Sequence, residues 1–247
     1  WECDEFSLPP INELVIYELH AGTFGADAEN GSKDLLGIAQ RFEHLQRLGI
    51  NSIQIMPLAE FAGDLSWGYN PSNIFAVESS YGGPKALKSL VKEAHRCGLG
   101  VILDVVYNHF GPSDLDHSLW QFDGWSENGK GGIYFYNDWR SETPWGDTRP
   151  DYGRPEVRQY IRDNAMMWLD EYHIDGLRYD MTLFMRSVRG DDSDSGDDLP
   201  DGWGLSQWMN REIRERFPGR ITIAEDLQNN DWLTKPVGEG GAGFHAQ

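Results

Sequence analysis

The chain has 247 residues, of which 39% are hydrophobic and 13% aromatic, and this is enough to bury one sizeable core. Its formal net charge of −19 argues against nucleic acid or an anionic membrane surface as a partner, because both require a basic face. The sequence contains no run of about 18 apolar residues, so it predicts no transmembrane helix. Cys3 and Cys97 are far apart and suggest neither a disulfide framework nor a metal-binding spacing.

Apolar patterns predict strands and helices in alternation along the chain. The predicted strands are Leu14–Leu19, Ile53–Met56, Val101–Val106, Gly176–Asp180 and Ile221–Glu225. The predicted helices begin near Leu35 (continuing to Leu48), Pro84, Pro155 and Leu205. The run Val101–Val106 is almost continuously apolar, as in strands buried on both faces of a parallel sheet. The alternation therefore predicts an α/β fold with parallel crossovers.

Polar residues follow the carboxyl ends of several predicted strands, namely His20, Asp104 to His109, Asp180 and Glu225. This placement is typical of the active face of a (β/α)8 TIM barrel. No G-x-G-x-x-G motif follows the first strand, so a dinucleotide-binding fold lacks its main support. Five strands cannot close a barrel. We therefore expect residues 1–247 to form an incomplete portion of a catalytic barrel, with about five or six strands and the remainder elsewhere.

The long irregular stretch 111–154 follows the third predicted strand and is rich in Gly, Asp and Trp. Connections of this length inside a domain are usually functional. We expect this stretch to form an inserted loop subdomain.

Arg178 and Asp180 are two residues apart on a predicted strand, so their side chains project to the same face. An adjacent Arg lowers the pKa of a carboxyl group and keeps it ionised, as a nucleophile requires. A purely structural ion pair is the alternative for an isolated Arg-x-Asp.

Three strand-end motifs, in order and with a helix between each pair, form a specific set. They are Asp104-Val105-Val106-Tyr107-Asn108-His109, Gly176-Leu177-Arg178-Tyr179-Asp180 and Ile223-Ala224-Glu225-Asp226, and they are accompanied by Tyr17-Glu18-Leu19-His20, Trp67-Gly68-Tyr69-Asn70-Pro71 and Tyr81-Gly82-Gly83. Together these motifs resemble the α-amylase family of glycoside hydrolases, from about Val15 to His245. Within the family the chain looks most like α-glucan branching enzymes and maltooligosyl-trehalose trehalohydrolases.

The resemblance implies cleavage of α-glucosidic bonds with retention, through a covalent glucosyl-Asp180 intermediate. Asp180 matches the nucleophile, Glu225 the general acid/base, and Arg178 the residue that orients the nucleophile. The substrate-binding positions implied in the same way are Asp104, His109 as a sugar ligand in the reacting subsite, and Tyr69 as its stacking platform. His20 could also line the cleft, although a packing role is equally compatible with its position.

The chemistry of the residues agrees with this assignment. Retaining cleavage needs two carboxyl groups about 5–5.5 Å apart, one ionised and one protonated. Glu225 follows an apolar Ile-Thr-Ile-Ala run, and partial burial there would raise its pKa toward the acid role. Neighbouring parallel strands lie about 4.8 Å apart, so carboxyl groups at their ends can meet the required spacing.

Several alternatives stay open from the sequence. Transfer of the branching-enzyme kind and hydrolysis of the trehalohydrolase or amylase kind share one intermediate. The family's His-Asp motif, which follows its seventh strand, is absent from these 247 residues, so a non-catalytic glucan-binding piece is the rival interpretation. We expect an α-glucan or maltooligosaccharide as the partner, no cofactor and a cytoplasmic location. Calcium at Asn108 with loop carboxylates is compatible with the sequence but not required by it.

Overall fold

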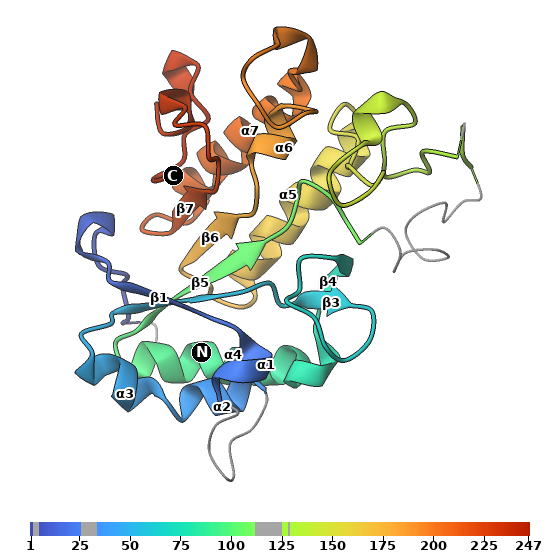
Figure 1. The fold of residues 1–247 in the computed structure, drawn as a ribbon. Helices are drawn as coiled ribbons and strands as arrows, with labels where there is room; N and C mark the ends of the chain where they lie inside the picture. The colour runs from blue at the N-terminus through green and yellow to red at the C-terminus, as the bar shows by residue number, and fades with distance from the viewer. Residues whose placement is uncertain (2–4, 26–33, 112–124, 128) are drawn as a thin grey trace.

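A five-stranded parallel sheet, in the order β1-β2-β5-β6-β7, forms the centre of the computed structural model (Figure 1), which describes residues 1, 5–25, 34–111, 125–127 and 129–247. Its strands are β1 (Ile16–Leu19), β2 (Ser52–Ile55), β5 (Gly100–Val105), β6 (Gly176–Tyr179) and β7 (Ile221–Ala224). All five predicted strands are present, each within two residues of its predicted bounds. At the outer edge of β7, Ala246 forms a parallel bridge with Ile223.

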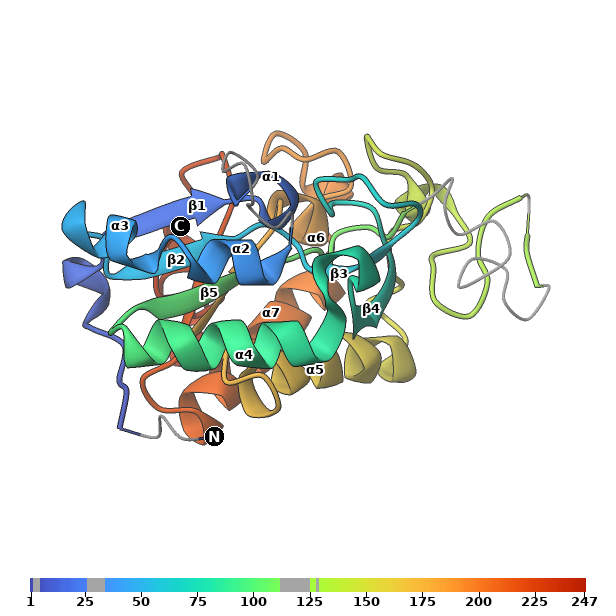
Figure 2. The same ribbon diagram turned by 90° about the horizontal axis from the view of Figure 1, so that it is seen from below.

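Helices connect the strands, and the longer ones lie along one side of the sheet, as Figures 1 and 2 show. They are α1 (Ala21–Phe24), α2 (Leu35–Ala39), α3 (Phe42–Arg47), α4 (Gly83–Arg96), α5 (Pro155–Asp170), α6 (Leu183–Arg186) and α7 (Pro200–Arg216). A parallel sheet with alternating helices confirms a portion of a (β/α)8 barrel, and the sheet does not close within the described residues. None of the described helices has the length and apolar character that a membrane crossing requires.

The single helix predicted from Leu35 to Leu48 is wrong, because α2 and α3 are separate. The amide of Arg41 bonds to the carbonyl of Ile38, which makes a tight turn where a helix would continue. The buried side chains Leu35, Ile38, Phe42 and Leu45 nevertheless all join the core. The apolar period therefore indicated which residues are buried but could not indicate the break between them.

An antiparallel hairpin of β3 (Ala59–Phe61) and β4 (Pro71–Val77) was not predicted. Register shifts interrupt its pairing, so the sequence lacks a clean two-residue alternation. The hairpin loop carries Tyr69. Gly68 in this loop has a φ of 90°, and a Cβ there would lie 2.4 Å from the Pro57 carbonyl oxygen. Only glycine fits this position, which fixes the approach of Tyr69 to the sheet.

The described part of the predicted 111–154 subdomain is mostly irregular, with one short 3₁₀ helix at Trp139–Ser141 and isolated bridges. Arg149 is completely buried and ties this segment together by donating to the carbonyl oxygens of Arg140 (2.6 Å) and Val188 (2.9 Å). Residues 112–124 and 128 lie outside the described residues. The boundaries of the subdomain stay a prediction.

The amino end of the sheet is held by a buried carboxylate, Asp175, just before β6. It accepts hydrogen bonds from the Val101 amide (2.8 Å) and from His95 Nε2 (2.7 Å), and it pairs with Arg220. Burial and the charge of Arg220 lower the pKa of His95 to about 4, so this imidazole is neutral at pH 7. Asp175 therefore joins β5, β6, β7 and α4 at the end of the sheet that usually serves stability.

Candidate active site

The parallel register of β6 and β7 places Asp180 and Glu225 at neighbouring strand ends. Tyr179 pairs with Ala224, and the Glu225 amide bonds to the Tyr179 carbonyl oxygen at 3.1 Å. Asp180 and Glu225 each directly follow the last residue of their strand, so they lie side by side at the carboxyl end of the sheet. Neighbouring parallel strands are about 4.8 Å apart. This spacing matches what two cooperating carboxyl groups need.

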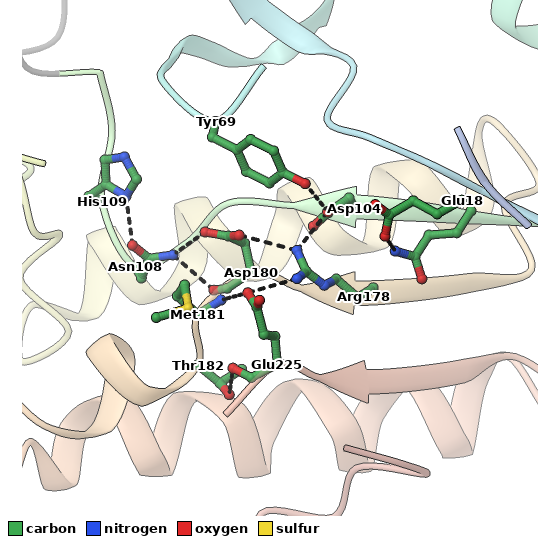
Figure 3. A network of polar contacts seen from close by, with 11 residues as sticks. Glu18, Tyr69, Asp104, Asn108, His109, Arg178, Asp180, Met181, Thr182 and Glu225 are labelled. Atoms are coloured by element: carbon green, nitrogen blue, oxygen red, sulfur yellow. Dashed lines mark hydrogen bonds and ion pairs between the residues drawn. The ribbon is translucent and has the colours of Figure 1, made fainter. Parts of the chain in front are cut away.

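Arg178 joins the carboxyl groups of three neighbouring strands (Figure 3). Its Nη1 lies 2.7 Å from Asp104 Oδ2 and 3.1 Å from Asp180 Oδ1, and its Nη2 lies 2.7 Å from Glu225 Oε2. The guanidinium is a rigid planar fork, so groups bound to its two terminal nitrogens converge on it. Arg178 therefore orients both Asp180 and Glu225.

Asp180 is nearly buried and accepts a hydrogen bond on each carboxylate oxygen. Arg178 contacts Oδ1, and Asn108 Nδ2 donates to Oδ2 at 2.8 Å and also to the Asp180 carbonyl oxygen at 2.8 Å. Burial raises the pKa of Asp180 to about 6, although Arg178 and Asn108 both act to lower it. The prediction that Asp180 has a lowered pKa beside Arg178 is therefore wrong, because the loss of solvation on burial outweighs the effect of the neighbouring positive charge. At pH 7 the carboxylate is still ionised.

Glu225 is held by the two residues that follow Asp180. The Met181 amide donates to Glu225 Oε2 at 3.0 Å, and the Thr182 amide donates to the Glu225 carbonyl oxygen at 2.8 Å. Met181 has a φ of 38°, in the left-handed region that non-glycine residues rarely adopt. Within the described residues both carboxylate contacts fall on Oε2. Since Arg178 and Met181 donate to that oxygen, Oε1 is the oxygen able to carry a proton.

Tyr69 and Asp104 form the side of the site next to β5. The Tyr69 hydroxyl donates to Asp104 Oδ2 at 2.9 Å, so the ring is anchored at its outer end. Burial raises the pKa of Asp104 to about 7, and burial together with Asp104 raises the pKa of Tyr69 well above its ordinary value. Asp104 Oδ1 is buried and has no hydrogen-bond partner among the described residues. Asp104 Oδ2 is also the oxygen that pairs with Arg178.

His109 reaches the site through Asn108. Because the Asn108 amide nitrogen donates to Asp180, its oxygen must accept, and His109 Nδ1 therefore carries the proton of their 2.6 Å contact. Burial lowers the pKa of His109 to about 3, so the ring is neutral. Its face stacks on Trp145 with ring centroids 4.7 Å apart. In this structure His109 supports Asn108, and its expected contact with a sugar stays a prediction.

His20 lies at the end of β1, away from the contacts of Arg178. Its Nε2 is 2.9 Å from both the Tyr81 hydroxyl and the Ser66 carbonyl oxygen, and Nδ1 is 3.1 Å from Thr23 Oγ1. These contacts give His20 a packing role in the described structure. Lining of the cleft by His20 stays a prediction.

Sequence reasoning did not identify Asn108, Met181 and Thr182 as supports of the two carboxyl groups. For Asn108 the sequence did contain an indication of a role in the site, since this residue directly precedes His109 in the motif at the end of β5. The sequence is compatible with Asn108 as a calcium ligand, whereas in the structure its amide is bonded to Asp180 and His109. In the described part of the chain, no three His, Cys, Asp or Glu side chains gather as a metal-binding group.

Comparison with known proteins gives a consistent result. The profile of the alpha-amylase catalytic domain matches residues 19–140. A 1,4-alpha-glucan branching enzyme of Pseudoalteromonas atlantica is 35% identical over 245 residues, which cover 94% of this chain and 32% of that protein. A malto-oligosyltrehalose trehalohydrolase of Saccharolobus solfataricus is 42% identical over 182 residues, which cover 73% of this chain and 29% of that protein.

The chain belongs to the α-amylase family. This confirms the resemblance found in the strand-end motifs. Among solved α-amylase-family structures, a putative alpha amylase from Salmonella typhimurium superposes with a TM-score of 0.66 and is 28% identical, covering 91% of this chain and 35% of that chain. The chain spans about a third of the length of the curated α-amylase-family relatives that it matches.

Proposed function

We propose that this α-amylase-family chain carries the catalytic carboxyl groups of an enzyme that cleaves α-1,4-glucosidic bonds of an α-glucan with retention. Asp180 is the nucleophile and Glu225 the general acid/base. The supporting observation is the contact of one guanidinium, that of Arg178, with both carboxylates. A structural ion pair would need only one of them.

In the first step, a lone pair of the Asp180 carboxylate attacks the anomeric carbon and the bond to the leaving oxygen breaks. Glu225 gives its proton to that oxygen, so the released chain leaves as an alcohol. Arg178 and Asn108 orient the Asp180 oxygens for this attack. Asp104, Tyr69, His109 and His20 are proposed to border the site of the reacting sugar.

In the second step, Glu225 takes a proton from an acceptor, whose oxygen displaces Asp180 from the anomeric carbon. Water as the acceptor gives hydrolysis, and a sugar hydroxyl gives transfer. We favour transfer to an α-glucan, as the name of the Pseudoalteromonas atlantica relative indicates. The Saccharolobus solfataricus relative, a trehalohydrolase, makes hydrolysis the second candidate.

The test uses the full-length protein with amylose as substrate, scoring branch points against reducing ends. Asp180→Asn and Glu225→Gln are expected to lower turnover by roughly 10³-fold or more, because each removes a group that reacts in both steps. Asp231→Asn and Glu239→Gln change exposed carboxylates and serve as matched controls. Near-normal turnover in either site variant would overturn the assignment.

The same assay gives a pH dependence. The nucleophile must be ionised, and burial raises the pKa of Asp180 to about 6. Turnover of the wild-type protein is therefore expected to fall as the pH drops through about 6. A rate that stays constant down to about pH 4, the ordinary range of an Asp carboxyl group, would contradict this role for Asp180.

A further inference from the structure

A buried ion pair lies directly behind Glu225. Arg186, at the end of α6, donates through Nε to Asp226 Oδ2 at 2.7 Å and through Nη2 to Asp226 Oδ1 at 2.6 Å. The Asp226 side chain is completely buried and the Arg186 side chain is 9% exposed. Two parallel hydrogen bonds of this kind fix the relative orientation of both groups. Asp226 is the residue that follows Glu225.

The start of the same segment also holds Glu225. Thr182 bonds to the Glu225 carbonyl oxygen twice, through its amide at 2.8 Å and through Oγ1 at 2.7 Å. Thr182 Oγ1 also lies 3.3 Å from Asp226 Oδ2. Residues 182–186 therefore hold residues 225 and 226 in place through hydrogen bonds from both backbone and side chains. Because Thr182 is two residues from Asp180, these hydrogen bonds link the positions of the two proposed catalytic groups.

Glu225 needs such a support because it lies beyond the end of a strand. β7 ends at Ala224, and the chain turns at Leu227, which has a φ of 32° and is 70% exposed. A buried ion pair is costly to desolvate and is often no more stabilising than well-packed apolar residues. An Arg–carboxylate fork in this place is better explained by the orientation that it imposes on Glu225.

We infer that Arg186 is a positioning residue for the general acid/base, acting through Asp226. This inference rests on the proposed function, since it concerns how Glu225 is placed for proton transfer. Arg186 also contacts Asp192, whose side chain is 41% exposed and does not adjoin Glu225. The contact of Arg186 with Asp192 therefore provides a control, because it involves the same arginine but not Glu225.

The test separates proton transfer from the rest of the reaction by the choice of leaving group. When amylose is the substrate, the leaving oxygen must receive a proton. When α-glucosyl fluoride is the substrate, the leaving group is fluoride, which needs no proton, so the first step no longer depends on a general acid. In the full-length protein, Arg186→Lys keeps the charge but loses the two-bond fork. We expect kcat on amylose to fall about 10- to 100-fold with KM unchanged. Single-turnover release of fluoride should stay within about twofold of the wild-type rate.

Asp226→Asn disrupts the same fork from the other side and should show the same split, which keeps the inference testable if one variant folds poorly. Two controls are expected to behave as the wild type on both substrates. Asp192→Asn removes only the exposed partner of Arg186, and Arg162→Lys alters a comparable pair with Glu212 between α5 and α7. Thermal unfolding midpoints are to be measured for every variant, to check that each one is folded at the assay temperature.

The outcomes distinguish this inference from the proposed function. Glu225→Gln should also lose amylose turnover while it retains the first-turnover release of fluoride. If Glu225→Gln shows that split and Arg186→Lys and Asp226→Asn do not, or lower both rates equally, the positioning role is overturned and the proposed function stands. If Glu225→Gln itself shows no split, the proposed acid/base is wrong and the inference fails with it.

Discussion

Arg178 shares one positive charge among three carboxyl groups, those of Asp104, Asp180 and Glu225. One positive charge cannot neutralise three carboxylates, and burial makes two of them still harder to ionise. It raises the pKa of Asp180 to about 6 and that of Asp104 to about 7. A group that is harder to ionise in the folded chain than in the unfolded one makes folding less favourable at neutral pH. The site is therefore built at a cost in stability, as is common where function needs buried charge.

Asp180→Asn should make the protein more stable at pH 7. The pKa of Asp180 is raised from 3.8 to about 6, so between these values the folded chain holds a proton that the unfolded chain has released. Stability falls as the pH rises through this window, and the full cost, about 2–3 kcal/mol, is present above pH 6. Asn removes this cost at pH 7 but gains little at pH 4, where Asp180 is protonated when folded.

Urea unfolding of the wild type and Asp180→Asn at pH 7 and at pH 4 measures the difference directly. Equal gains at the two pH values, or a loss at pH 7, would contradict the account of a desolvated carboxylate. The same variant is expected to lose turnover, so stability and activity should move in opposite directions.

Among individual residues, the sequence predicted the contact of Arg178 with Asp180 because side chains two positions apart on a strand share a face. It predicted the direction of the Asp180 pKa incorrectly, because a sequence shows the neighbouring Arg but not the degree of burial. It also gave no sign that the Met181 amide faces Glu225, since that contact depends on a φ of 38° set by tertiary packing.

At the scale of elements, two buried carboxylates flank β6, one with a structural role and one in the candidate site. Asp175, just before the strand, links neighbouring strands and α4, whereas Asp180, just after it, lies in the candidate site. Parallel strands were predictable because their apolar runs are separated by helices. The β3–β4 hairpin was not, because its short, irregular pairing leaves no alternating pattern.

The close packing of β6 against β7 gives a prediction for the strands themselves. A Cβ added at Gly176 would lie 2.6 Å from Ile221 Cγ1 and 3.2 Å from the Ile221 carbonyl oxygen. Gly176→Ala should therefore push the two strands apart, with a loss of about 1–3 kcal/mol in unfolding free energy. Since these strands carry Asp180 and Glu225, turnover should fall as well.

Gly238→Ala is the matched control, because a Cβ at Gly238 meets nothing within 4 Å. Denaturant unfolding and amylose turnover of both variants check the prediction. A Gly176→Ala protein as stable and active as Gly238→Ala would mean that the β6–β7 spacing is not critical.

At the scale of the whole molecule, the order of the strands explains why a site could be predicted at all. The carboxyl ends of parallel strands meet at one edge, so polar residues far apart in the chain, such as Asp104, Asp180 and Glu225, had to gather there. Contacts that depend on loops, such as Arg186 with Asp226, could not be foreseen. They depend on how α6 packs and on where the chain turns after β7.

The five-stranded sheet has two outer strands, β1 and β7, where a closed barrel would have none. Ala246 bridges the outer edge of β7, so β1 is the more open edge in the described part of the chain. On the β1 side, Val15, Ile16 and Tyr17 are 49%, 38% and 36% exposed. Apolar outer strands with unpaired backbone groups are sites of association. Residues 1–247 on their own should therefore self-associate.

Sedimentation of the isolated chain at micromolar concentrations tests this. Ile16→Lys places a charge on the outer strand and should weaken self-association about tenfold or more, because a buried lysine opposes strand pairing. Leu65→Lys, at a loop position that is 95% exposed, adds the same charge away from the edge and should leave association unchanged. A wild-type chain that stays monomeric throughout, or equal weakening by both variants, would show that the outer edge of β1 does not control association.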